Sequence, residues 1–176
     1  MERPVLVTYA TKYGSTEEVA RAIAETLRES GVAVELLSAR SVHSLAGYCA
    51  AVLGAPLYIG RMHGDARRFL SVNRSDLMKM PVALFVLGPV EKKEKDWVGA
   101  RQQMEKELTK FPWLSPVAKE ILGGKFDPTK IGFPFNMIPA LRKIPASDAR
   151  DWTAIRTWAS ELPVALHCET LSRSTS

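Results

Sequence analysis

The chain has 176 residues, of which 46% are hydrophobic and 24% are charged, with a net charge of +5 and a pI near 9.3. These values predict one globular domain with its own core. No apolar run approaches the roughly 20 residues of a membrane span, and no signal peptide precedes the first apolar run. We therefore expect a cytoplasmic protein.

The basic charge alone would allow nucleic acid, an acidic partner or an anionic membrane surface. No zinc-finger or RNP motif accompanies it, so we expect no nucleic-acid binding. The two cysteines, Cys49 and Cys168, lie far apart and show no metal-ligand spacing. The sequence therefore predicts neither a disulfide framework nor a metal site.

The first apolar run, at 5–7, leads into the segment Thr11-Lys12-Tyr13-Gly14-Ser15-Thr16 and then into apolar residues at helical spacing. This pattern predicts a strand, a hydroxyl-rich loop and a helix over 16–30. Free backbone N–H groups at a helix start attract anions, and the loop lacks the glycine spacings of triphosphate and dinucleotide loops. We expect it to bind one phosphate. The alternative is a helix start that Ser15 or Thr16 caps without any ligand.

Further along the chain, strands alternate with helices. We expect strands at 32–37, 50–53 and 82–87, with a fifth around Ile121 and Leu122; we expect helices at 65–73, after 91–96 and after Asp148, and a short helix or turn at 41–45. This alternation predicts a five-stranded parallel sheet with right-handed crossovers.

Two loops follow the third and fourth strands, at 54–63 and 88–90. Open α/β sheets bind ligands at the carboxyl ends of their strands, so both loops are candidate ligand contacts. The alternatives are that Tyr58 and Ile59 pack against neighbouring helices and that Gly88-Pro89 only reverses the chain. The roles of Arg61 and His63 stay open.

An extra segment at 127–145 precedes the last helix, and its prolines interrupt any long helix. Four basic residues and one acidic residue between 125 and 143 flank apolar and aromatic side chains. This composition suits a membrane interface, a hydrophobic substrate or a partner, or a loop that packs onto the domain. We expect Asp148 to cap the last helix, Trp152 and Trp158 to face the core, and 167–176 to form a flexible tail.

The segment from Tyr9 to Glu17 resembles the phosphate loop of the flavodoxins. The resemblance implies an α/β, doubly wound sheet of order 2-1-3-4-5 in a domain at 1–166, with FMN as the cofactor. It also implies that Tyr58 stacks on the flavin ring. The implied cofactor-binding residues are Thr11, Lys12, Tyr13, Gly14, Ser15, Thr16, Pro56, Leu57, Tyr58, Ile59, Gly60, Gly88, Pro89 and Val90.

Among flavodoxin-like proteins, the chain resembles the flavodoxin-domain family of menaquinone-dependent protoporphyrinogen oxidase. The shared features are the pattern Gly-Ala-x-x-x-x-Gly-x-x-His at 54–63 and Asp151-Trp152 after an extra segment. This implies an oxidoreductase of heme biosynthesis that acts on a hydrophobic substrate with a quinone, and it allows peripheral contact with the membrane surface through 125–144. The alternatives are a flavodoxin-type carrier that serves a redox protein and a non-enzymatic flavin- or anion-binding module. The residues assign neither a catalytic side chain nor an oligomeric state.

Overall fold

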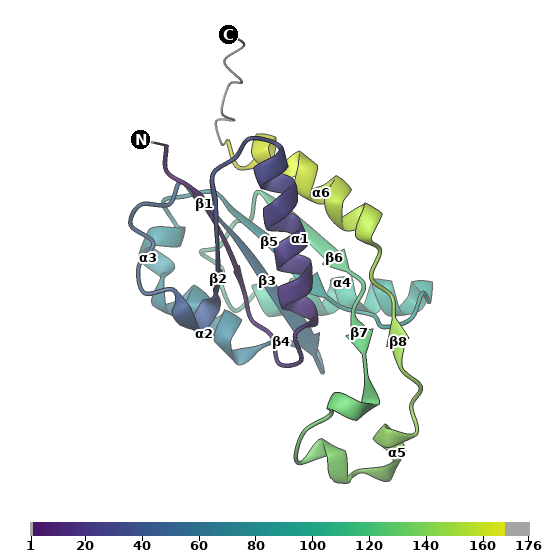
Figure 1. Ribbon diagram of the computed structural model, residues 1–176. Coiled ribbons are helices and arrows are strands. Elements are labelled where there is room, and N and C mark those ends of the chain that lie inside the picture. The colour runs from purple at the N-terminus through teal and green to yellow at the C-terminus, as the bar shows by residue number, and fades with distance from the viewer. Residues whose placement is uncertain (1, 168–176) are drawn as a thin grey trace.

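The computed structural model describes residues 2–167, which form a parallel sheet of order β2-β1-β3-β5-β6 (Figure 1). Its strands are β1 (Val5–Tyr9), β2 (Val34–Ser38), β3 (Ala50–Tyr58), β5 (Val82–Leu87) and β6 (Ala118–Leu122). Val5 pairs with Val34 on one side and with Ala50 on the other. The expected sheet of five parallel strands in the order 2-1-3-4-5 is confirmed, with β5 and β6 as its fourth and fifth strands.

Helices cover both faces of this sheet. The helix α1 (Ser15–Glu29) and the helix α6 (Trp152–Ala165) pack on one face. The other face carries α2 (Gly64–Val72), α3 (Arg74–Leu77) and α4 (Glu94–Leu108). Strands covered on both faces need apolar residues at consecutive positions, which explains the unbroken apolar runs in the sequence.

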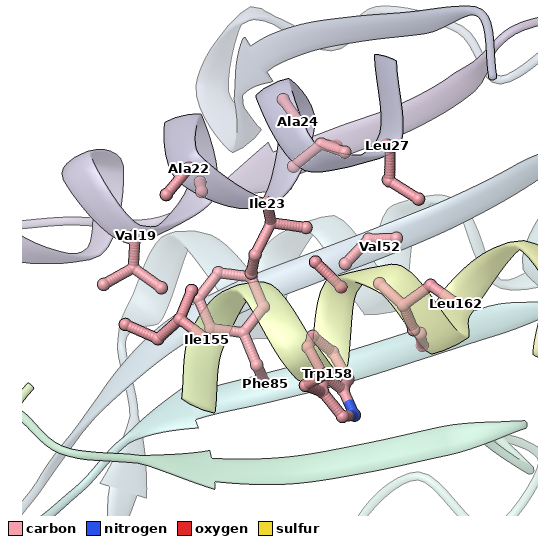
Figure 2. Packing of buried hydrophobic residues seen from close by; sticks show 14 of the residues in the cluster. Val19, Ala22, Ile23, Ala24, Leu27, Val52, Phe85, Ile155, Trp158 and Leu162 are labelled. Atoms are coloured by element: carbon pink, nitrogen blue, oxygen red, sulfur yellow. The ribbon is translucent and has the colours of Figure 1, made fainter. Parts of the chain in front are cut away.

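The core between α1, α6 and the sheet is centred on Phe85 (Figure 2). The Phe85 ring meets the Trp158 ring edge-on, with 6.1 Å between centroids. It also lies over Gly54, where an added Cβ would stand 1.9 Å from the Phe85 Cζ atom. Glycine at 54 is therefore required for this packing, and the expected core position of Trp158 is confirmed.

The starts of two helices differ from expectation. Gly14, with φ of 91°, is the N-cap of α1, so neither Ser15 nor Thr16 caps it. Asp151 is the N-cap of α6, where its carboxylate accepts from the backbone N–H of Ala154 at 3.0 Å. The expected cap Asp148 is therefore wrong: it lies in the strand β8 (Ser147–Asp148), where an ion pair holds its side chain.

Two connections also differ. Where we expected a short helix or turn at 41–45, the structure has a single 3-10 turn slightly earlier, η1 (Ala39–Ser41). The loop expected at 54–63 is mostly strand, because β3 continues to Tyr58 and pairs antiparallel with β4 (Arg61–Met62). Pairing buries Met62 to 3% exposure, which favours a hairpin over an open loop.

The extra segment is held on a two-stranded stalk. Strand β7 (Lys125–Phe126) pairs antiparallel with β8. Between them lie η2 (Pro128–Lys130), η3 (Phe135–Met137) and α5 (Pro139–Arg142). The whole excursion extends beyond the end of the sheet at which the parallel strands finish (Figure 1). Apart from His167, the expected tail lies outside the described residues.

Candidate functional site

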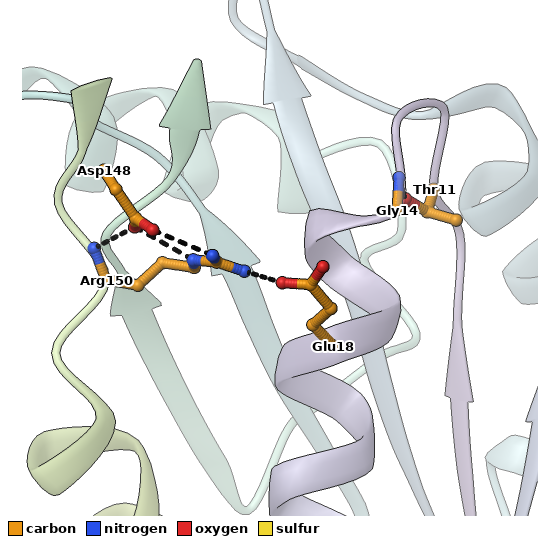
Figure 3. A network of polar contacts seen from close by, with 5 residues as sticks. All are labelled: Thr11, Gly14, Glu18, Asp148 and Arg150. Atoms are coloured by element: carbon orange, nitrogen blue, oxygen red, sulfur yellow. Dashed lines mark hydrogen bonds and ion pairs between the residues drawn. The ribbon is translucent and has the colours of Figure 1, made fainter. Parts of the chain in front are cut away.

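The loop between β1 and α1 is closed by its own hydrogen bond. The backbone N–H of Gly14 donates to Thr11 Oγ1 at 2.8 Å (Figure 3). Gly14 can adopt its positive φ because it has no Cβ. The loop thus leads directly into α1. The free backbone N–H groups of the first turn lie at the positive end of the helix dipole.

Thr16, in the first turn of α1, has a buried side-chain hydroxyl that bears on the phosphate prediction. The residue is 0% exposed, and its Oγ1 has no hydrogen-bond partner among the described residues. A buried hydroxyl without a partner costs about 1–3 kcal/mol. A phosphate held against the helix start could accept a hydrogen bond from that hydroxyl, so the loop fits the phosphate of the expected FMN.

A cavity of about 460 Å³ opens beside the loop at the carboxyl ends of the strands. Its volume lies in the range of ordinary cofactor sites. Four chain segments wall it: the phosphate loop with the start of α1, the β3–β4 hairpin, the segment after β5, and the stalk with the extra segment. The expected site residues that line it are Lys12, Tyr13, Ser15, Pro56, Leu57, Tyr58, Ile59, Gly88 and Val90.

The other expected site residues do not line this cavity. Thr11 and Gly14 are joined by the loop hydrogen bond, and Thr16 is fully buried. Gly60, with φ of 73°, completes the hairpin turn. Pro89 lines a second cavity of about 520 Å³, together with residues of α4.

Tyr58 offers an aromatic face at the cavity. The residue is 39% exposed, and its ring lies edge-on to that of Tyr13, with 6.4 Å between centroids. Burial, and secondarily the nearby Tyr13, raises the pKa of Tyr58 to about 12. The phenol is therefore neutral at physiological pH, and its ring can pack on a flat conjugated ligand.

Lys12 connects the phosphate loop to the extra segment. Its Nζ lies 5.3 Å from the Tyr13 ring centroid and 5.4 Å from that of Phe135. Cation–π contacts of this kind are worth about 0.5–1 kcal/mol at exposed sites. The extra segment also lines the cavity with Phe126, Ile131, Phe135 and Leu141 and with the charged residues Lys125, Asp127 and Lys130.

The base of the stalk is tied to α1. Arg150, just after β8, forms ion pairs with Asp148 and with Glu18 of the first turn of α1 (Figure 3). Hydrogen bonds from Arg150 lower the pKa of Asp148, and hydrogen bonds to Asp148 raise the pKa of Arg150. The extra segment and the phosphate loop therefore share one charged anchor beside the cavity.

Outside the stalk and the extra segment, three cavity residues were not among those expected from the sequence: Glu18, Leu87 and Gly124. The pair Gly123-Gly124 after the fifth strand was the available signal for the last of them. An added Cβ at Gly124 would stand 2.9 Å from the carbonyl oxygen of Gly88. The glycine thus allows the two loops to approach each other at the cavity wall.

Two neighbouring residues, whose roles the sequence left open, lie outside the cavity wall. His63 is the N-cap of α2, with Nδ1 accepting from the backbone N–H of Asp65 at 3.1 Å. Arg61 is an exposed residue of β4 and does not line the cavity. Over residues 2–167, no cluster of metal-ligating side chains could hold an ion, and no helix is long and apolar enough to cross a membrane.

Comparison with known proteins identifies relatives of the chain. The family model for the Flavodoxin domain matches residues 6–144. The protoporphyrinogen IX dehydrogenase [quinone] of Escherichia coli K12 is 24% identical over 168 residues, covering 89% of this chain and 93% of that protein.

Two solved structures show the same fold. A cysteine-to-alanine mutant of flavodoxin from Pseudomonas aeruginosa has a TM-score of 0.58 and 17% identity, covering 93% of this chain and 99% of that one. The rubredoxin oxygen:oxidoreductase of Desulfovibrio gigas has a TM-score of 0.54 and 18% identity. The match covers 94% of this chain but only 37% of the Desulfovibrio protein.

Proposed function

This chain belongs to the flavodoxin-domain family, and from that premise we propose that it is an FMN-dependent oxidoreductase that takes hydrogen from a hydrophobic, porphyrinogen-like substrate and delivers it to a quinone. Family membership implies FMN as the cofactor. The single observation that carries the proposed activity is the apolar wall that the extra segment adds to the cavity beside the phosphate loop. A carrier that only exchanges electrons between proteins has no need of such a wall.

In this proposal each cavity segment has a defined task. The loop at 11–16 binds the FMN phosphate through its hydroxyls and the N–H groups at the start of α1. Tyr58 packs on one face of the flavin ring, while the backbone at Ile59 and Gly60 and the segment 88–90 border it. The bound flavin supplies the redox chemistry, and the protein supplies position, shielding and local charge.

The extra segment provides the substrate side. Phe135 and Leu141 offer apolar contacts for a large ring, and Lys12 and Lys130 offer cations for carboxylates on its rim. For each pair of hydrogens removed from the porphyrinogen, one quinone is reduced to a quinol. The relative from Escherichia coli, whose name includes both the substrate and the quinone, supports this assignment.

A further part of the proposal is that the tip of the extra segment contacts the surface of the membrane, where quinones reside. The exposed side chains of the tip support this part. Phe133 is 76% exposed and Met137 is 71% exposed, and neither is covered by the rest of the described chain. Arg142 and Lys143 follow closely in the sequence. Apolar side chains beside cations favour an interface with anionic lipids.

A flavodoxin-type electron carrier is the second candidate. It is favoured by the likeness to a whole flavodoxin, of which the chain covers 99%. The pI near 9.3 opposes it, because flavodoxin carriers are usually acidic proteins that dock on basic partners.

One experiment separates the two candidates. The bound FMN is reduced anaerobically, and its reoxidation is followed with a menaquinone analogue and with a soluble one-electron acceptor, beside a porphyrinogen oxidation assay. We expect reaction with the quinone and with the porphyrinogen. Reaction with the soluble acceptor alone would replace the proposed activity with electron carriage.

A further inference from the structure

Ile59 occupies an unusual backbone conformation at the tip of the β3–β4 hairpin. Its φ is 49°, and that of Gly60, the second residue of the turn, is 73°. Positive φ at both central positions is typical of two-residue hairpin turns, where Asn-Gly and Asp-Gly predominate. A β-branched residue at positive φ is an outlier, because its Cβ substituents crowd the backbone.

Packing does not offset this strain. Ile59 is 95% exposed, the highest value among the large exposed hydrophobic residues of the described chain. Its side chain therefore gains almost nothing from folding, whereas asparagine at the same position would relieve the strain and suit the solvent. Strained residues that bring the fold no evident gain occur preferentially at functional sites.

The position of Ile59 indicates what its side chain could contact. It lies beside Tyr58 and borders the cavity, so its exposed side chain stands at the cavity mouth. The cations Lys12 and Lys130 and the aromatic Phe135 line the same cavity from the phosphate loop and the extra segment. Tyr58 and Ile59, the hairpin residues at this border, are uncharged, whereas Arg61, which pairs with Tyr58 across the hairpin, is exposed and does not line the cavity.

We propose that Ile59 is a docking residue for the electron acceptor, and that its side chain packs on the uncharged ring of a quinone at the hairpin border of the cavity. This inference rests on the proposed function. A carboxylate-bearing substrate would take the cationic border, whereas a neutral ring gains from an apolar contact that carries no charge. Isoleucine is then retained at position 59 in spite of the backbone strain, because a polar residue that suits the turn would not offer this apolar contact.

The test uses Ile59→Asn, with Val164→Asn as the matched control. Val164 is also β-branched and is 81% exposed, and it lies near the end of α6, away from the cavity. Three quantities are measured for each protein: the thermal midpoint without flavin, the dissociation constant of FMN, and the rate constants for reoxidation of the reduced flavin by a menaquinone analogue and by ferricyanide.

For Ile59→Asn we expect a thermal midpoint about 3 °C higher than that of the wild type. We expect its rate constant with the menaquinone analogue to fall about five-fold or more, since an apolar contact is lost. The ratio of the quinone rate to the ferricyanide rate should fall by the same factor. Val164→Asn should leave this ratio unchanged.

Three results would overturn the inference. An unchanged ratio in Ile59→Asn would remove the docking role, and a lower thermal midpoint would remove the argument from strain. If the wild type binds FMN and reacts with ferricyanide but not with the quinone, the proposed function itself fails and this inference fails with it. The last result is distinct, because it appears before any substitution is made.

Discussion

Arg150 donates a hydrogen bond to Glu18 across 132 positions of the chain, and it thereby joins the stalk of the extra segment to the first turn of α1 (Figure 3). The same guanidinium donates to Asp148 through Nε at 2.9 Å and through Nη2 at 2.8 Å. It also lies over the Trp152 ring, 4.8 Å from its centroid. With its side chain only 5% exposed, Arg150 fastens one wall of the cavity to the helix that carries the phosphate loop.

Replacing this arginine should loosen the stalk. Arg150→Met keeps the aliphatic stem but removes every hydrogen bond of the guanidinium, while the bond from the backbone N–H of residue 150 to Asp148 remains. We expect the free energy of unfolding to fall by about 1–2 kcal/mol. Hydrogen exchange over 125–148 should speed up more than exchange in β1. Arg21→Met is the control, because Arg21 is 58% exposed in its pair with Glu17 and such pairs contribute about 0.2–1 kcal/mol. Equal effects of the two substitutions would contradict the anchoring role.

The anchor should also make stability depend on pH. Hydrogen bonds from Arg150 hold the pKa of Asp148 below its ordinary value of 3.8. The stabilisation is therefore fully present above pH 3.8 and is lost as the pH falls through the lower pKa of the folded state. In urea unfolding, wild type should exceed Asp148→Asn in stability at about pH 6, and the difference should shrink at pH values below the ordinary pKa of the carboxyl. In an Arg150→Met background the difference should be small at both pH values.

Thr16 provides a test of the phosphate assignment. Thr16→Val removes a buried hydroxyl that has no partner within the described chain, so the flavin-free protein should be as stable as wild type or more stable. FMN affinity should fall about 10- to 150-fold, since a hydrogen bond to a charged group is worth about 1.5–3 kcal/mol. Riboflavin, which lacks the phosphate, should bind both proteins alike in fluorescence titrations. A parallel loss of riboflavin affinity would indicate a general change in the site.

Tyr58 should contact the ring of the cofactor and not its phosphate. Tyr58→Leu keeps an apolar side chain but removes the aromatic face, whose stacking is worth about 0.5–1.5 kcal/mol beyond area. We expect the affinities for FMN and for riboflavin to fall by the same factor, about 2- to 13-fold. An effect on FMN alone would place Tyr58 at the phosphate instead.

The exposed tip of the extra segment should govern binding to lipid. The double variant Phe133→Ser and Met137→Ser should bind vesicles that contain anionic lipid more weakly than wild type in co-sedimentation, because both side chains are exposed. Added salt should weaken the binding of wild type. The matched control, Val72→Ser and Met78→Ser, removes two exposed apolar side chains of 71% and 58% exposure from the ends of α2 and α3. If the two double variants bind vesicles equally, the tip is not the contact surface.

The main architecture could be read from the sequence because its signals are local. Residues 82–87 form an unbroken apolar run, and the spacing of Val19, Ile23 and Leu27 places them on one helix face. The polar loop between strand and helix predicted a phosphate site, and Thr16 has a buried hydroxyl suited to that role. The strand and the helix depend on neighbours within a few positions, so hydrophobic periodicity was sufficient to predict them, while the phosphate site stays a prediction.

Tertiary structure alone decided which distant segments meet at the site. Strands β4, β7 and β8 have two residues each, which is too short for any alternation to mark them. The sequence predicted Asp148 as the cap of the last helix, but Asp151 is the cap. Asp148 instead pairs with Arg150, which also pairs with Glu18 far away in the chain. The cavity likewise combines the phosphate loop, the hairpin and the extra segment. Such contacts leave no periodic pattern in the sequence, because their energy arises only after the sheet has brought the segments together.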